Sequence, residues 1–467
     1  MSRIEEVLVS RFSYKNLIVL FVVLFAYLFG FVMATGSHVA VLLLQAGGVI
    51  VFAIAVILAP MEWILLGSII LAILADSKLV SANLVYYARF VPLGALAARA
   101  VFDLLFRRHQ KRLVPVSFLI PGLFLLLIAF VSSVYSIDPS LTLQRSLSMA
   151  FVVIGFSVAL PMYMSTRQEM EDRLKRIIGI VVFIVVLGTL FYDRQGANYY
   201  EGGASLVTGL FKNPNMQGLV CMVLFFPTFW WWQRSRYGMT KWLAALSVLT
   251  IAGLIMISGS RASILGSLCG VLAMTWFEGR TSGKNLLFLI LGLVIITSIA
   301  FPDLDLAGKI LSTDDAGRYA LWQHALDMGS RAPILGIGFG AASSLGNEFY
   351  LGAHNSYLYM FVELGAVGVI VGITVFALVL LRVFVSESAV RGDALVAALS
   401  GAIVAGLVDS FFEDGLFSFG QSSSVMLWFF LALLALRVEM LSRESEEIPE
   451  QIPVAQVTEN LLPGAAG

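Results

Sequence analysis

The stretch Asn355–Phe384, NSYLYMFVELGAVGVIVGITVFALVLLRVF, decides the fold class. A helix needs about 20 mostly apolar residues to cross the hydrocarbon core of a bilayer. This stretch is longer than that and carries only Glu363 and Arg382 as charges. Thirteen further apolar runs lie at Asn16–Met33, Val39–Leu58, Met61–Leu74, Leu84–Phe106, Leu113–Tyr135, Leu147–Met164, Ile177–Tyr192, Leu219–Trp232, Trp242–Ile257, Ala262–Phe277, Leu286–Phe301, Leu395–Val408 and Ser424–Leu436. We therefore predict an all-α, polytopic transmembrane helical bundle.

The number of spanning helices is predicted as twelve to fourteen. Met61–Leu74 is short, and Leu84–Phe106 carries Arg89 and Arg99 in an otherwise apolar run. If these two segments re-enter the membrane or lie flat, twelve spans remain. Either number leaves both termini on the same side of the membrane.

The composition supports a membrane protein. Hydrophobic residues make up 59% of the chain and charged residues 13%, with a mean hydropathy of +0.90. Soluble domains carry roughly 25% charged residues, because their surface must be hydrated. The net charge is zero, so no basic surface indicates nucleic acid as a partner. Cys221 and Cys269 lie inside apolar runs, which argues against a disulfide scaffold or a cysteine metal site.

The distribution of basic residues predicts the orientation. Cytoplasmic connections of membrane proteins are enriched in Lys and Arg. Twenty of the 30 Lys and Arg residues fall on the alternate connections that include the N-terminal segment, and eight fall on the others. Both termini are therefore predicted to be cytoplasmic, with two long outer connections at Asp193–Asn213 and Pro302–Ala353.

Five segments follow from this pattern. They are a cytoplasmic N-terminal segment (1–15), helices one to eleven (16–301), an outer loop (302–353), the last three helices (354–438) and a disordered cytoplasmic tail (439–467). The tail is rich in Glu and Pro, a composition that favours disorder. The outer loop contains an amphipathic helical pattern around Arg318–Met328, and structured loops of this length are often functional.

Three helices that run inward from the outer side begin with polar groups. Their starts are Lys212-Asn213-Pro214-Asn215, Ser258-Gly259-Ser260-Arg261-Ala262-Ser263 and Ala353-His354-Asn355-Ser356. Asn213 and Ser260 are typical N-caps, and Pro214 suits a first helical position. Free N–H groups and the helix dipole favour anions at such ends. If the three starts converge, they would form a pocket for a diphosphate.

Each of these elements also has an ordinary structural explanation. A lone interfacial Arg261 more often extends to lipid headgroups. Asn213-Pro214-Asn215 alone is a common helix start. Arg318 could belong to the solvated face of a short helix, and His354 could only cap its helix. The occurrence of all of them on one predicted side favours a functional site.

His354 is the predicted general base. Imidazole has a pKa near neutrality, which suits it to take a proton from a hydroxyl. Glu363 follows nine residues later, on roughly the opposite face of the helix, so a partner for His354 is expected from another segment. If His354 only caps its helix, the base is expected among Asp409, Glu413 and Asp414 of the last outer loop.

Two acidic clusters lie in the predicted outer loop. Asp303-Leu304-Asp305 matches the metal-binding pattern of nucleotide-sugar glycosyltransferases, and Asp314-Asp315 is a second cluster. Nucleotide sugars are not supplied on the outer side, so we interpret these acids as loop solvation. Neither a metal nor a cofactor is expected.

Seven short segments carry a family resemblance. In chain order they are Ser136–Pro139, Gly209–Asn215, Ser260-Arg261, Gly317–Trp322, Pro333–Gly340, His354–Tyr357 and Glu363–Gly368. Together they resemble the signature of the O-antigen ligase and polymerase superfamily, which includes exopolysaccharide polymerization proteins. The resemblance covers roughly residues 110–440, and the segment at His354 is its most specific part.

This resemblance implies a GT-C-type glycosyltransferase at the periplasmic face of the bacterial inner membrane, surrounded by membrane lipids. The donor would be a glycan on undecaprenyl diphosphate. His354 would take the proton from the acceptor hydroxyl, and direct attack would invert the anomeric carbon without a metal. Donor-binding residues would be Arg261, Arg318, Lys212, Asn213 and Asn215, and acceptor or supporting residues would be Asn355, Trp322, Glu363 and Glu413.

Several functions remain open at this point. A ligase would use lipid A–core or another glycan acceptor, whereas a polymerase would use another lipid-linked repeat; the outer loop is compact for docking lipid A–core. A glycan-lipid flippase or transporter is a further alternative. Transporters place ionisable residues near the bilayer midplane, often beside broken helices, whereas the polar groups here collect on one side. A scaffold within a polysaccharide assembly complex would leave His354 without a role.

Overall fold

The structure is a computed structural model that describes residues 59–78, 89–106, 113–192, 208–278, 318–345, 354–386 and 388–447. The helices in these ranges are α4 (Met61–Ala75), α6 (Phe90–Phe106), α7 (Val116–Ser132), α8 (Pro139–Tyr163), α9 (Arg167–Tyr192), α10 (Pro214–Arg234), α11 (Met239–Ile257), α12 (Arg261–Glu278), α15 (Arg318–Ser330), the 3-10 helix η2 (Ala341–Ser344), α16 (Ser356–Val385), α17 (Ser388–Arg391), α18 (Ala394–Asp409) and α19 (Ser422–Glu447). These ranges contain no β-strand beyond isolated bridges.

The predicted fold class is confirmed. Helices α8, α9, α11, α16 and α19 are long and apolar enough to cross a membrane, and α4, α7 and α18 are shorter apolar helices. Eleven of the fourteen predicted runs coincide with helices, including the two weak ones. The other three, Asn16–Met33, Val39–Leu58 and Leu286–Phe301, lie outside the described residues. The chain is an all-α, multi-pass membrane protein.

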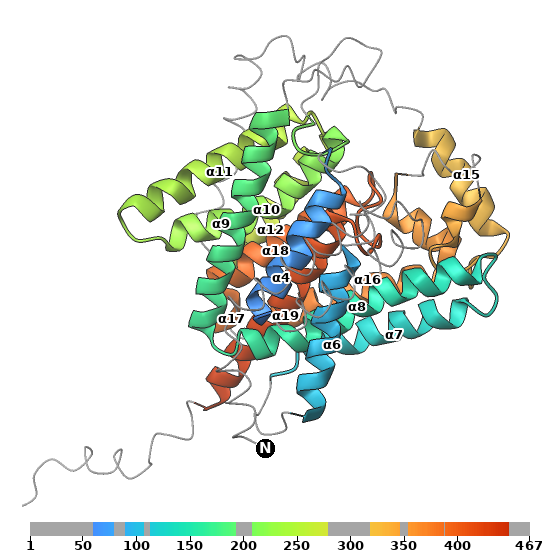
Figure 1. Ribbon diagram of the computed structural model, residues 1–467, viewed down its shortest axis with the longest axis horizontal. Helices are drawn as coiled ribbons and strands as arrows, with labels where there is room; N and C mark the ends of the chain where they lie inside the picture. The colour runs from blue at the N-terminus through green and yellow to red at the C-terminus, as the bar shows by residue number, and fades with distance from the viewer. Residues whose placement is uncertain are drawn as a thin grey trace, which may run out of the picture.

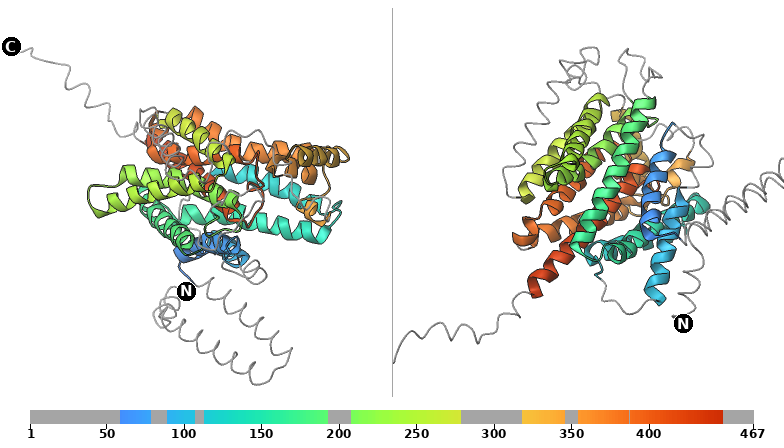
Figure 2. Two further views of the ribbon diagram at one scale, coloured as in Figure 1. Left: turned by 90° about the horizontal axis from the view of Figure 1, so that it is seen from above. Right: turned by 60° about the vertical axis from the view of Figure 1, so that its left-hand side comes forward.

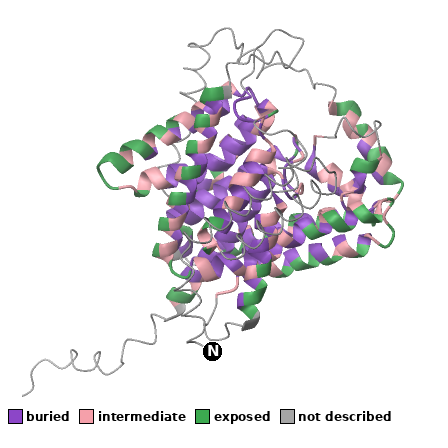
Figure 3. Ribbon diagram, in the orientation of Figure 1, coloured by how far each residue is buried: buried purple, intermediate pink, exposed green. Residues whose placement is uncertain are grey.

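Helix α19 runs through the middle of the bundle. Helices α9 to α12 lie on one side of it, and α7, α8 and α16 lie on the other (Figures 1 and 2). Burial is concentrated around this central helix (Figure 3). Its Trp428 is fully buried and packs edge-on against Phe118 of α7 and Phe376 of α16, at ring-centroid distances of 5.9 and 5.4 Å. Aromatic pairs in this geometry add to the burial of apolar area.

Helices α12 and α18 approach each other closely because small residues face one another. A Cβ added to Gly270 would lie 2.6 Å from the carbonyl oxygen of Gly401, and one added to Gly266 would lie 2.8 Å from that of Ala405. Gly266 and Gly270 form a GxxxG pattern, which lets membrane helices pack backbone to backbone. This contact fixes the start of α12 beside the end of α18.

A charged network joins α9, α18 and α19 at the end opposite to the one described below. Arg437 is fully buried and donates to Asp393 at 2.7 Å and to Glu171 at 2.8 Å. Arg167 lies 3.6 Å from Asp393. The apolar runs predicted from the sequence left residues 167–176, with their basic side chains, in a connection. In the structure these residues form the first turns of α9, which begins ten residues earlier than predicted.

The predicted boundary of the C-terminal tail is wrong. Helix α19 continues past 439 to Glu447. Two side-chain contacts stabilise the last turns of this helix. Arg443 donates to Glu439 at 3.3 Å, and Glu444 accepts from Arg167 of α9 at 2.8 Å. Pairs of opposite charge four residues apart stabilise a helix in spite of a polar composition. Residues 448–467 lie outside the described part of the chain.

The single span predicted at Asn355–Phe384 is broken in the structure. Gly365 has φ 63° and ψ −163°, which interrupts α16. The segment before η2 runs alongside the break: Ile337 N–H donates to the Val362 carbonyl at 3.0 Å, and Ala366 N–H donates to the Pro333 carbonyl at 2.8 Å. These bonds satisfy peptide groups that an unbroken helix would pair internally, as a break in a membrane helix requires.

Candidate active site

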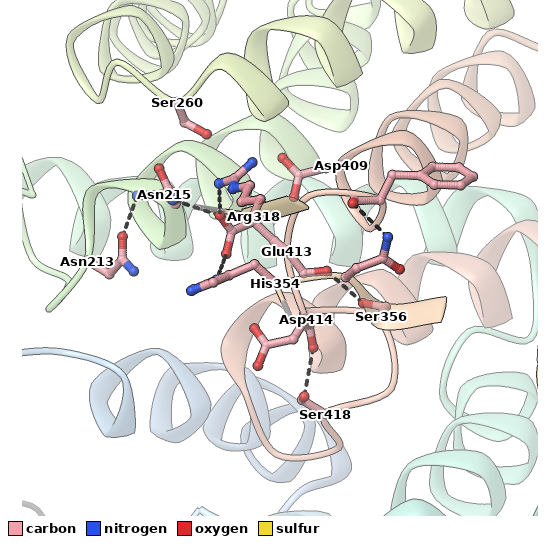
Figure 4. Close-up of polar contacts among 12 residues, drawn as sticks. Asn213, Asn215, Ser260, Arg318, His354, Ser356, Asp409, Glu413, Asp414 and Ser418 are labelled. Atoms are coloured by element: carbon pink, nitrogen blue, oxygen red, sulfur yellow. Dashed lines mark hydrogen bonds and ion pairs between the residues drawn. The ribbon is translucent and has the colours of Figure 1, made fainter. Parts of the chain in front are cut away.

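The Glu413 carboxylate connects three separate segments. Its Oε1 accepts from Nδ2 of Asn215 at 2.7 Å and from a guanidinium nitrogen of Arg318 at 3.2 Å (Figure 4). Its Oε2 lies 3.4 Å from Nδ1 of His354. Glu413 is 7% exposed, so these charge-assisted bonds are largely shielded from water. One carboxylate thus links the starts of α10 and α15 with the residue before the N-cap of α16.

The loop that carries Glu413, between α18 and α19, is tied to the start of α16. Ser356 Oγ donates to the Glu413 carbonyl at 2.8 Å, and Asn355 Nδ2 donates to the Phe411 carbonyl at 3.0 Å. Asn355 is also the N-cap of α16, because its Oδ1 accepts from the N–H of Tyr357 at 3.0 Å. Asn355 and Glu413, both predicted to support His354, thus take part in the contact between the start of α16 and this loop.

His354 adopts a backbone conformation that non-glycine residues rarely use. Its φ is 43°, the only positive φ of a non-glycine residue in the described ranges. Such strain is often found at functional sites, where surrounding contacts maintain it. The hydrogen bond to Glu413 raises the pKa of His354, against the opposing effect of partial burial. With Nδ1 turned to the carboxylate, Nε2 is the nitrogen that faces away from it (Figure 4).

The starts of α10 and α12 lie beside this contact. Asn213 caps α10 by accepting from the N–H of Asn215 at 2.8 Å, and Pro214 occupies the first turn. A Cβ added to Gly218 of α10 would lie 2.8 Å from Cβ of Ser260, which shows how closely the two helix starts approach. Together with the start of α16 at His354, the starts of α10 and α12 are the three polar helix starts that the sequence analysis considered as a possible pocket.

Asp409 connects the start of α12 to the same end of α18. Ser263 Oγ donates to Asp409 Oδ1 at 3.0 Å, and the Ser260 and Ser263 hydroxyls are 3.0 Å apart. Asp409 is fully buried and lies one helical turn before Glu413. Arg261 follows Ser260 as the first residue of α12 and is half-buried.

The remaining predicted residues lie farther from Glu413. Lys212 is exposed, and its backbone N–H donates to the Asp76 carbonyl at 3.3 Å. Trp322 packs against Phe412, with ring centroids 6.4 Å apart. Glu363 lies near the break in α16, close to the backbone of Gly340 and Ala342 and to Arg145. Glu363 is separated from His354 by about two turns of α16, in agreement with the prediction that the two side chains do not contact each other directly.

The sequence missed a polar cavity beside the Glu413 loop. The cavity has a volume of about 240 Å³, and its charged lining residues are Asp76, Arg89, Arg145, Glu363 and Asp414. The prediction placed Arg89 inside a span, but it precedes α6 and lies 3.8 Å from Asp76. An ionisable residue within an apolar run is itself a sign of function, and this signal could have identified Arg89.

Two of these cavity acids are held in a low-polarity setting. Burial raises the pKa of Asp76, although its carboxylate accepts from Ser422 N–H at 2.6 Å. Burial, followed by the nearby charge of Glu413, raises the pKa of Asp414. In the described part of the chain, no group of three or more His, Cys, Asp or Glu residues is placed to hold a metal ion. Asp303–Asp305 and Asp314-Asp315 lie outside that part.

Comparison with known proteins adds two findings. A model of the family described as O-antigen ligase matches residues 245–373. The exopolysaccharide production protein ExoQ of Rhizobium meliloti (strain 1021) is 23% identical over 273 residues, which covers 52% of this chain and 60% of that relative. Both findings support the predicted resemblance to the O-antigen ligase and polymerase superfamily and indicate a membrane enzyme of glycan assembly. The matched region thus spans less than two thirds of the relative's length.

The O-antigen ligase match includes part of the candidate site. It contains Arg261, Arg318, His354 and Glu363, and it ends within α16. Glu413 lies after the matched region and Asn215 before it. Glu413, which contacts His354 and Arg318, and Asn215, which contacts Glu413, thus come from outside the family match, and only the folded structure brings them to the site.

Proposed function

We propose that this protein is a membrane glycosyltransferase that moves a glycan from undecaprenyl diphosphate to an acceptor hydroxyl at the periplasmic face. The contact of His354 and Arg318 with one carboxylate, Glu413, carries this proposal. It places a base and a guanidinium beside one another at one end of the bundle. The match of residues 245–373 to the O-antigen ligase family supports the class of reaction and of substrate.

The reaction is a direct displacement. The acceptor oxygen attacks the anomeric carbon while the bond from that carbon to the diphosphate oxygen breaks. Undecaprenyl diphosphate leaves with the electron pair, the configuration inverts, and Nε2 of His354 takes the proton from the hydroxyl. Glu413 acts as a positioning residue, since its bond to Nδ1 orients the ring and stabilises the imidazolium that forms.

The diphosphate is held by Arg318 and Arg261 together with the starts of α10 and α12. Arg318 donates one bond to Glu413, which leaves further N–H groups for phosphate oxygens. The capped start of α10, with Asn213 and Asn215, supplies a helix dipole directed at the anion. Lys212 adds positive potential from the rim. Charge on the leaving group is thereby stabilised as the bond breaks.

The location proposed is the bacterial inner membrane, with both termini in the cytoplasm and the site in the periplasm. The five segments predicted from the sequence are retained in this proposal, with the boundary of the tail moved to follow α19, which ends at Glu447. A ligase with lipid A–core or another glycan as acceptor is the first candidate. A polymerase of lipid-linked repeats is the second, and the name of the exopolysaccharide production relative favours it. Either enzyme could act within a polysaccharide assembly complex.

A flippase or transporter is disfavoured by the placement of charge. The break in α16 at Gly365 is a feature that transporters share. However, Arg318, His354 and Glu413 lie at the ends of helices and in a loop, where a substrate is met at the membrane surface. A relay of ionisable groups along the bundle axis would be needed for passage.

The test is a transfer assay with the full-length protein in lipid nanodiscs and the host's lipid-linked glycan. His354→Gln is expected to lose about 10²–10⁴-fold in rate, because an amide cannot accept the proton. It should still bind undecaprenyl diphosphate, whereas Arg318→Ala should lose that binding and Arg318→Lys should restore little of it. His324→Gln, on the same outer helix as Arg318, is the matched control and should keep its rate. Normal transfer by His354→Gln would overturn the proposal.

A further inference from the structure

The cavity beside the Glu413 loop has no role in the reaction as proposed so far. It is lined by residues of α8, α16, the segment Phe339–Ser343 and the loop between α18 and α19, together with Asp76 and Arg89. Ser356 and Asp414 of this lining adjoin the candidate active site. Its volume of about 240 Å³ is slightly below the roughly 300–1,000 Å³ of pockets for drug-sized ligands. A single small ring therefore suits it.

Arg145 of α8 lines this cavity, and its positive charge acts on the nearby Glu363 carboxyl group. Within the described residues its guanidinium forms no hydrogen bond or ion pair. Its stem lies across Gly340, where an added Cβ would be 2.4 Å from Cγ of Arg145 and where φ is 73°. Only glycine satisfies both conditions, so the backbone is shaped around this side chain. A cationic side chain in the transmembrane bundle of a membrane protein is expected to have a function.

The walls opposite Arg145 carry hydrogen-bond acceptors and aromatic rings. Glu363 and Asp414 present carboxyl groups, and Tyr359 and Phe417 present rings. The third acid, Asp76, is already occupied: it accepts from Ser422 and lies 3.8 Å from Arg89. Glu363 also accepts from the backbone N–H groups of Gly340 and Ala342. The lining as a whole carries two guanidinium and three carboxyl groups, which gives no excess of positive charge.

We propose that this cavity binds an uncharged sugar ring of the acceptor glycan. Carboxylates accept hydrogen bonds from sugar hydroxyls, and a guanidinium donates to them. Aromatic rings pack against the C–H faces of a pyranose. An anionic sugar would meet three carboxyl groups of the lining, against the two guanidinium groups of Arg89 and Arg145. The lining therefore selects a neutral, hydroxyl-rich ring.

The position of the cavity fits an acceptor rather than a donor. Figure 4 shows Ser260 and Asp409 on one side of the His354–Glu413 contact and Asp414 and Ser418 on the other. The donor diphosphate is proposed on the first side, and the cavity begins on the second. A direct displacement needs the two substrates to approach from opposite sides of the reacting carbon. This assignment rests on the proposed function for its choice of acceptor over donor.

The test measures binding of sugar without transfer. The probe is the unlipidated oligosaccharide released by mild acid from the host's lipid-linked repeat, titrated into the full-length protein in nanodiscs in the absence of donor. Arg145→Ala and Glu363→Gln are each expected to weaken binding about 10–100-fold, as loss of a hydrogen bond to a charged group does. Arg331→Ala is the matched control, since Arg331 follows α15, is 71% exposed and pairs with Asp327, four residues earlier.

Ser343→Trp provides a second variant that does not touch a buried group. Ser343 is exposed at the rim of the cavity, so an indole there should fill it and abolish binding while the protein stays folded. A methyl glycoside of the terminal sugar should compete with the probe, and the corresponding uronate should not. Binding that is unchanged in all three variants, or competition by the uronate alone, would overturn the proposal. Normal transfer by His354→Gln would instead refute the proposed reaction and leave this binding result standing.

Discussion

Glu413 lies between His354 and Arg318 and contacts both, with Oε2 3.4 Å from Nδ1 of the imidazole and Oε1 3.2 Å from the guanidinium. The proposed base and the proposed diphosphate clamp therefore share one carboxylate. Any movement of the loop between α18 and α19 changes both at once. Arrival of a diphosphate at Arg318 would compete for the guanidinium and leave Glu413 more strongly engaged with His354.

Glu413→Gln should shift the pH dependence of transfer. The carboxylate raises the pKa of His354, so in the wild type the base becomes deprotonated, and active, only as the pH rises through that raised pKa. The amide removes the negative charge, the pKa falls, and the acidic limb of the pH–rate profile for kcat/KM should move to lower pH. The plateau rate should fall about tenfold or more, because the imidazolium is less stabilised.

Glu439→Gln is the control for this profile, since Glu439 lies on α19 and pairs with Arg443 away from His354. It should leave the limb in place. An unshifted acidic limb in Glu413→Gln would show that His354 does not titrate in the reaction. The profile is measured by transfer assays between about pH 5 and 9, a range that brackets the ordinary pKa of imidazole.

Gly365→Ala should destabilise the protein. A Cβ at this position would lie 2.3 Å from the carbonyl group of Ile334, and the φ/ψ values belong to a region that only glycine uses readily. We expect a loss of at least about 1–3 kcal/mol, measured as a lower thermal midpoint in detergent. Gly253→Ala in α11 is the matched control. Nothing lies within 4 Å of its added Cβ, so it should be neutral or slightly stabilising.

The sequence predicted the membrane helices well because each must be apolar over its length, whatever it packs against. It also predicted the polar starts of α10, α12 and α16, since N-caps such as Asn213 are local signals. The break at Gly365 could not be predicted in the same way. It depends on the segment at Pro333, which lies about thirty residues earlier and supplies the missing hydrogen bonds.

The candidate site shows the same division. His354 and Arg318 could be proposed from residue type and position, but their contact through Glu413 depends on how a later loop folds back. Arg145 is one of the eight Lys and Arg residues on the predicted outer connections, and no local sequence pattern distinguishes it from the other seven. What distinguishes it is the cavity it faces, which is lined by six segments distant in sequence. Properties of this kind arise from packing.

Asn213→Ala should lower stability by about 1 kcal/mol, within the usual range for loss of an N-cap. The Asn213 side chain accepts from the N–H of Asn215 and satisfies one free donor at the start of α10. Asn213→Ser should retain most of the stability, because a hydroxyl oxygen can accept the same bond. Thermal unfolding in detergent measures both variants. Equal losses in both would show that Asn213 acts through its amide group rather than as a cap.

Arg437→Met should strongly destabilise the protein without changing the activity of the folded fraction. Arg437 is fully buried and holds Asp393, and removing one partner of such a pair typically costs about 3–5 kcal/mol. Adding Asp393→Asn should recover much of this loss, because Asn keeps the cap on α18 without an unpaired charge. The readouts are unfolding midpoint and transfer rate per folded molecule. No recovery in the double variant would show that the charge of Asp393 is not the source of the loss.

The orientation can be tested with cysteines at two tyrosines that the fold leaves exposed. Tyr319, 63% exposed on α15, is expected in the periplasm, and Tyr237, 95% exposed in the turn between α10 and α11, is expected in the cytoplasm. The native Cys221 and Cys269 are first replaced by alanine, which removes background labelling. In spheroplasts, a membrane-impermeant maleimide should label Tyr319→Cys directly and Tyr237→Cys only after permeabilisation. The opposite pattern would place His354 and Arg318 in the cytoplasm and would refute the proposed periplasmic transfer, because both residues lie at the same end of the bundle as Tyr319.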